Sequence, residues 1–357
     1  MALTAIALFL ATSGRQAGMI ELGRKFVAGE KLVYLTKAEI TDEQRSGDLQ
    51  TFIPHDESYA YRHTLDVQKL KADGIAEVMY LRPTMAITMG DTAAAAAKTT
   101  TEKLDWKLQM DISPVNEILS LKDVTPKKPD APKKNDGLRW LRRHGVQGSQ
   151  ADGAAVGLLF QFVEEVQRLA FFIGGFDTSL DISPRMPFEE VKAGDTWLRT
   201  VSATPQKLKG KGEKMGVQRL DYTYTYQGIT KSSDGKDVHR IEAVVKLDTD
   251  MAEFARQLTG SSNASTSLKA VPLKFEAKVK YDLDLKTMHL LKAAAESSGG
   301  FSIVVKGVPQ PLLEDRFRGR TLVKLESWKK PGSTEPVAKP TANPGKKGGG
   351  KTRSGIV

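Results

Sequence analysis

The 357-residue chain has no cysteine. This absence excludes disulfides, thiolate metal ligands, cysteine nucleophiles and the lipidated cysteine of a bacterial lipoprotein. The chain also lacks an apolar run of the roughly 20 residues that a membrane-spanning helix needs, so we predict no transmembrane span. Hydrophobic residues make up 40% of the sequence and charged residues 27%, as in ordinary soluble proteins. The length and composition therefore predict a folded chain of about two domains.

The net charge of +10 is concentrated in two segments. Residues 120–150 hold eight Lys and Arg against three Asp, and residues 329–357 hold seven against one Glu. Both segments are also rich in proline, glycine and lysine and have little apolar periodicity, which predicts a basic flexible linker and a disordered basic tail. Neither interleaves aromatic residues with the basic ones, so we predict no specific nucleic-acid partner.

The N-terminus begins with an apolar run followed by small residues, which is typical of a signal peptide. Residues 1–17 are therefore predicted to be a leader, with cleavage after Ser13 or Ala17. The run lacks the usual initial Lys or Arg, so Met1 could be a late start inside a longer leader. The alternative is a buried N-terminal helix of a cytosolic protein. We favour export to the periplasm or the extracellular space of a bacterium.

Strict alternation of apolar and polar residues is the strongest signal in the chain. Residues 104–112 and 273–283 alternate almost without exception, which indicates strands with one buried face. Residues 61–67 and 220–226 alternate as well, and each is followed by an Asp-Gly pair that favours a tight turn. These patterns predict antiparallel hairpins.

These elements recur in the same order along the chain, which predicts an internal duplication. The turn at Gly29 corresponds to Gly194, the hairpin glycine Gly74 to Gly235, and the strand beginning at Leu104 to the one beginning at Leu273. We expect a first β unit at 20–119 and a second unit, preceded by a helix, at 151–328.

The helix is predicted over residues 154–173, where one narrow polar stripe leaves most of the circumference apolar. The expected fold is mainly β with an α+β character. It has two related antiparallel sheets or half-barrels, with this long amphipathic helix packed between or against them.

Catalytic motifs are scarce. The match to a phosphate-binding loop at 345–352 lies in the glycine- and lysine-rich tail, where no helix can follow it. His55, Asp56, Glu57 and His63 could gather around a metal, but a solvated loop is the commoner outcome. We therefore predict no catalytic residue, no metal and no cofactor, and we lean against an enzyme.

The order of a leader, a Gly-Glu or Gly-Asp turn into a Tyr or Trp strand, an Asp-Gly hairpin and an alternating strand resembles uncharacterised exported bacterial proteins built from duplicated β units. The resemblance covers about residues 20–328, ending with the strand that runs into Asp284-Leu-Lys-Thr287. It implies an envelope location and an antiparallel β architecture, and it implies no catalytic residue.

The sequence thus predicts a non-catalytic envelope protein that binds a lipid or other apolar ligand, or an envelope protein partner, through a curved sheet and the helix. The expected ligand-binding residues are Leu159, Phe160, Val163, Phe172, Tyr222, Phe275 and Val279. The alternative is a hydrolase with a dispersed active site. An enzyme would need polar residues such as His63, Glu77, His239 and Glu242 to converge in one pocket, whereas a lipid carrier would not.

Overall fold

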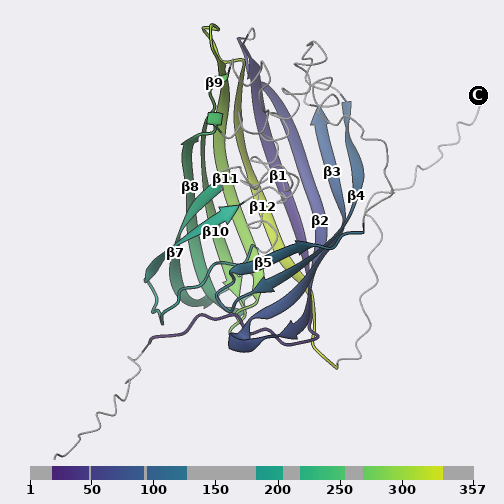
Figure 1. Ribbon diagram of the computed structural model, residues 1–357, viewed down its shortest axis with the longest axis vertical. Coiled ribbons are helices and arrows are strands. Elements are labelled where there is room, and N and C mark those ends of the chain that lie inside the picture. The colour runs from purple at the N-terminus through teal and green to yellow at the C-terminus, as the bar shows by residue number, and fades with distance from the viewer. Residues whose placement is uncertain are drawn as a thin grey trace, which may run out of the picture.

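The computed structural model describes residues 18–47, 50–91, 95–126, 182–203, 218–253 and 268–332. They form one large antiparallel sheet of twelve strands that curls around its own axis (Figure 1). The strands are β1 (Lys31–Ser46), β2 (Ile53–Leu70), β3 (Ala76–Asp91), β4 (Ala95–Ile112), β5 (Ile118–Asp123), β6 (Thr196–Ala203), β7 (Gln218–Lys231), β8 (Asp237–Asp250), β9 (Leu268–Ala270), β10 (Pro272–Leu283), β11 (Leu290–Val305) and β12 (Leu313–Lys329).

The strand order is β5-β4-β3-β2-β1-β12-β11-β10-β8-β7-β6, with β9 paired to β11 beside this path. Apart from β9, the strands within each of the two sets β1 to β5 and β6 to β12 neighbour one another in chain order, and β1 joins the last strand, β12, through pairs such as Thr36 with Val323. The order is therefore a ring that is open only between β5 and β6, since no pairing joins these two strands in the described residues.

The expected pair of separate sheets was therefore wrong. The two sets of strands, β1 to β5 and β6 to β12, join edge to edge because β1 pairs with β12 over their whole length. Such a pairing links residues about 300 positions apart in the sequence, so no local pattern could reveal it. The division into two units with a linker and a tail stays a prediction, and residues 127–181 and 333–357 lie outside the described residues.

The expected helix at 154–173 also lies outside the described residues. The described ranges contain no long helix, only the short 3-10 turn η1 (Ala72–Gly74) and a brief helical stretch near Ala252. The α+β description is therefore replaced by an almost pure antiparallel β-sheet. None of the helical segments in these ranges has the length and apolar character that crossing a bilayer requires.

Side chains along each strand alternate between a buried face and an exposed one. Tyr222, Tyr224 and Tyr226 of β7 are 2–4% exposed, whereas the intervening threonines are not buried. This alternation follows from the two-residue period of a strand. We call the buried face of the sheet the inner face and the opposite one the outer face.

Two segments cross the end of the sheet and hold its edges near each other. In segment 18–30, Ile20 pairs with Val191, and Arg24 N donates to Pro114 O at 2.8 Å. In segment 182–191, Met186 N donates to Val115 O at 3.0 Å. The loop between β4 and β5 and the chain before β6 are thus tied together here, and we call this the closed end.

Candidate ligand-binding site

The inner face is a continuous surface of apolar and aromatic side chains that crosses both sets of strands. It contains Leu65 and Val67 of β2, Val78 and Tyr80 of β3, Met110 of β4, Tyr222 and Tyr224 of β7, and Phe275, Val279 and Tyr281 of β10, all of them buried. Each residue faces inward because the strand period places alternate side chains on one side. A sheet with one apolar face must bury that face against another layer or a ligand.

The part of the inner face over β1 to β4 holds a stacked aromatic group. The His63 ring lies between Tyr34 and Tyr80, stacked on each at a centroid distance of 5.2 Å. The Arg82 guanidinium lies 3.9 Å from the centroid of the Tyr61 ring, and its Nε donates to the Tyr80 hydroxyl at 2.6 Å. This part therefore carries a fully buried positive charge among aromatic rings, which stabilise cations through their faces.

The part over β6, β7 and β10 carries a second aromatic stack. Trp197 stacks on Tyr224 at 5.5 Å, and Tyr224 stacks on Tyr222 at 5.6 Å. Burial raises the pKa of both tyrosines, that of Tyr224 to about 12, because it disfavours the phenolate, while the charge of Arg185 acts in the opposite direction. Both hydroxyls are therefore neutral hydrogen-bonding groups at physiological pH.

A buried polar cluster occupies the closed end. Arg24 Nε donates to His289 Nδ1 at 3.3 Å, which assigns the proton of a neutral imidazole to Nε2, 3.2 Å from Glu30 Oε2. The Trp328 indole N–H donates to the same oxygen at 2.8 Å, and Val27 N donates to Oε1 at 2.9 Å.

Both titratable groups in this cluster are shifted. Burial raises the pKa of Glu30, but the hydrogen bonds and charge that it receives outweigh this and leave the pKa below its usual value. Burial, reinforced by the charge of Arg24, lowers the pKa of His289 despite the nearby carboxylates. The cluster thus holds an ionised glutamate and a neutral histidine. Its hydrogen bonds join segment 18–30 to the sheet at the closed end.

Three of the predicted ligand-binding residues lie on the inner face, on two strands that flank β8. Tyr222 of β7 and Phe275 and Val279 of β10 are 2–5% exposed. The other four, Leu159, Phe160, Val163 and Phe172, lie outside the described residues. Sequence reasoning missed Arg185, which belongs to no periodic segment. It also missed Arg82, although this residue continues the buried alternation of β3 and could have been found from it.

The four polar residues that an enzyme would need to bring together do not share a face. His63 and His239 face inward, where His239 bonds the Tyr226 hydroxyl at 2.7 Å. Glu77 and Glu242 face outward, and Glu242 pairs with Lys280 at 3.4 Å. Within the described ranges, no group of three His, Asp or Glu could hold a metal ion. The four residues therefore do not converge in one pocket.

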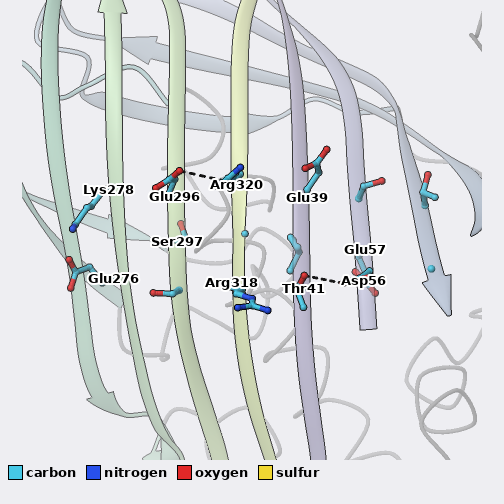
Figure 2. Close-up of a pocket in the computed structure, with 16 residues that line it drawn as sticks. Glu39, Thr41, Asp56, Glu57, Glu276, Lys278, Glu296, Ser297, Arg318 and Arg320 are labelled. Atoms are coloured by element: carbon cyan, nitrogen blue, oxygen red, sulfur yellow. Dashed lines mark hydrogen bonds and ion pairs between the residues drawn. The ribbon is translucent and has the colours of Figure 1, made fainter. Parts of the chain in front are cut away.

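The outer face is charged. A broad groove of about 1000 Å³ crosses β10, β11, β12, β1 and β2, and Figure 2 shows the acidic and basic side chains that line it. Arg320 pairs with Glu296 at 3.5 Å, and Thr41 donates to Asp56 at 3.0 Å. The two ion-pair partners are 79% and 73% exposed, so water screens their attraction. The sheet therefore has one face suited to water and one suited to apolar groups.

No family model and no curated protein matches the sequence. Among solved structures, one described as "Lipid-protein interactions in lipovitellin" is similar, with a TM-score of 0.40 and 11% identity over 88% of this chain. The chain spans 27% of the length of that lipovitellin chain. Pseudomonas aeruginosa OccK2 in complex with glucuronate has a TM-score of 0.17 and 7% identity over 87% of this chain and 100% of its own. These similarities are weak, so the function rests on the residues of this chain.

Proposed function

We propose that the inner face binds an apolar ligand. The observation that carries this proposal is the single-layer sheet with one apolar, aromatic-rich face and one charged face. The described residues form no second sheet against the inner face, so the groups that pack on this face come from the curled sheet itself, from the rest of the chain or from a ligand. Apolar burial at about 25 cal/mol per Å² gives such a surface ample binding energy for a lipid chain.

A hydrophobic fluorescent dye tests this proposal on the full chain. We expect binding in the micromolar range, and native mass spectrometry should detect an apolar molecule that co-purifies. Phe275→Asp should weaken dye binding by more than tenfold, because it places a carboxylate on the apolar surface. Lys274→Asp puts the same charge on the outer face one residue earlier and should leave binding unchanged, since Lys274 is exposed.

The outcome that contradicts the proposal is a wild-type chain that binds no dye and carries no ligand. The inner face would then be an ordinary close-packed interior. If Phe275→Asp fails to fold, competition between the dye and a fatty acid on the wild-type chain gives the same answer, because two ligands of one surface displace each other.

We further propose that the protein acts outside the bacterial cytoplasm, in the envelope. The apolar leader with small residues at Ala11, Ser13 and Ala17 supports this location. N-terminal sequencing of the protein from its native host should find a chain that begins near Gly14 or Gly18. Intact Met1 in a cytosolic fraction would contradict export.

A further inference from the structure

Arg185 is a buried cation without a carboxylate partner in the described ranges. The residue is 6% exposed, and its Nη1 makes one long hydrogen bond of 3.5 Å to the Ser183 carbonyl. A guanidinium carries five N–H donors, and this is the one hydrogen bond that the Arg185 guanidinium donates in the described residues. Burial of a charged group costs several kcal/mol unless hydrogen bonds or an opposite charge compensate it. The structure therefore holds a positive charge that needs an anion.

The backbone of Arg185 is fixed in place at the rim of the inner face. The Trp197 indole N–H donates to the Arg185 carbonyl at 2.8 Å, and Trp197 itself stacks on Tyr224. The charge of Arg185 acts on the hydroxyls of both Tyr222 and Tyr224, so the guanidinium lies close to this aromatic stack. The cation thus sits where the apolar surface of the second set of strands meets the closed end.

A second arginine adds to the positive charge. Arg199 Nη2 and Nε donate to the Met186 carbonyl at 2.7 and 3.1 Å, and its Nη1 lies 3.6 Å from Glu117 Oε1. Burial, with Arg185 among the contributing charges, lowers the pKa of Arg199. Glu117 is 41% exposed, so its charge is partly screened by water. A buried guanidinium and a partly buried one thus lie in this region, and only Arg199 pairs with the half-exposed Glu117.

We propose that Arg185, assisted by Arg199, binds the anionic head group of an amphiphile whose apolar chain lies along the inner face. This inference rests on the proposed function and narrows its ligand class to molecules with a carboxylate or phosphate at one end. The planar fork of a guanidinium matches both groups through paired hydrogen bonds. The Tyr222 and Tyr224 hydroxyls, neutral at physiological pH, provide further hydrogen bonds beside it.

Displacement of a bound dye by three molecules of equal chain length tests the proposal: a fatty acid, the corresponding alcohol and the corresponding alkyl phosphate. We expect the wild-type chain to prefer at least one anion to the alcohol by tenfold or more. Arg185→Gln should abolish this preference and leave the affinity for the alcohol unchanged, and Arg185→Lys should restore part of it. Arg318→Gln removes the same charge from the outer groove and should change nothing.

If the variants fail to fold, the pH dependence of ligand binding to the wild-type chain still tests the proposal. The preference for the fatty acid over the alcohol should disappear as pH falls and the carboxylate is protonated. Equal affinity for the acid, phosphate and alcohol overturns the proposal, and so does a preference that survives Arg185→Gln. Stabilisation by inorganic phosphate that depends on Arg185, without displacement by any chain-bearing anion, assigns the site to a free anion and also overturns it. Failure of all three molecules to bind is different, because it rejects the proposed function itself.

Discussion

Two turns in the molecule have the same backbone hydrogen bonds but lie in different surroundings. In the first, Gly29 N donates to Val67 O at 2.7 Å, and Val67 N donates to Glu30 O at 3.0 Å. In the second, Gly194 N donates to Tyr226 O at 2.7 Å, and Tyr226 N donates to Asp195 O at 3.0 Å. Both glycines have positive φ, +82° and +94°, a region that glycine adopts without strain. The turns precede β1 and β6, the first strands of the two sets.

The acidic side chains of the two turns make one equivalent contact and then differ. Glu30 Oε1 and Asp195 Oδ2 each accept a hydrogen bond from the backbone N–H three residues earlier, at 2.9 Å. Glu30 is fully buried, and its second oxygen receives His289 and Trp328. Asp195 is partly exposed, and its carboxylate makes no further hydrogen bond or ion pair among the described residues. The comparison teaches that local sequence makes the turn, whereas tertiary contacts decide how much the carboxylate stabilises the fold.

The strongest test of this difference is to remove each of the two carboxylates in a separate variant. Glu30→Ala should lower the free energy of unfolding by about 3–5 kcal/mol, because it removes a buried charge and the acceptor of the His289 and Trp328 N–H groups. Asp195→Ala should cost about 0.5–1.5 kcal/mol, the usual value of one hydrogen bond. Urea denaturation of the two variants measures both losses.

Equal losses in the two variants would contradict this account. They would show that the carboxylates act only through the turn that they share, and that the closed-end cluster adds nothing to stability. Glu30→Gln serves as an intermediate variant, because the amide keeps a hydrogen-bond acceptor and removes the charge.

The sequence predicted features that depend on near neighbours. Alternation located the strands that became β4 and β10, and the Asp-Gly pairs located the turns at Gly74 and Gly235, which have φ of +72° and +78°. Tyr222, Phe275 and Val279 were placed on the buried face for the same reason. Each of these features follows from a period of two or from the conformation of a single residue. That the two halves arose by duplication stays a prediction.

The features that the sequence did not predict depend on residues that are distant from one another in the sequence. Glu30 and His289 are 259 positions apart, and Arg24 and His289 are 265 apart, so no local pattern could have grouped them. The single sheet depends likewise on the pairing of the first and last strands. Arg185 lies in a segment without strand or helix periodicity, so its burial and the hydrogen bond from Trp197 to its carbonyl could not be predicted from a local pattern.

A smaller effect on stability should appear as pH falls. It tests the same two turns, because a histidine lies beside each of them. His289 bonds Glu30, and His239 bonds the hydroxyl of Tyr226, whose backbone pairs with the Asp195 turn. Burial lowers the pKa of both imidazoles below the ordinary value of 6.5. The unfolded chain therefore binds more protons than the folded chain below about pH 6.5.

Stability should accordingly be constant near pH 7 to 8 and fall as pH decreases through 6.5, by about 1.4 kcal/mol for each unit by which a histidine pKa is depressed. The lowered pKa of Glu30 adds a further loss in more acidic solution, below about 4.5, because protonation removes its charge from the cluster. His289→Gln and His239→Gln should each reduce the slope between pH 6.5 and 5. Urea denaturation across this range provides the measurement. A wild-type stability that does not change between pH 7 and 5 would show that neither ring is held neutral by the fold.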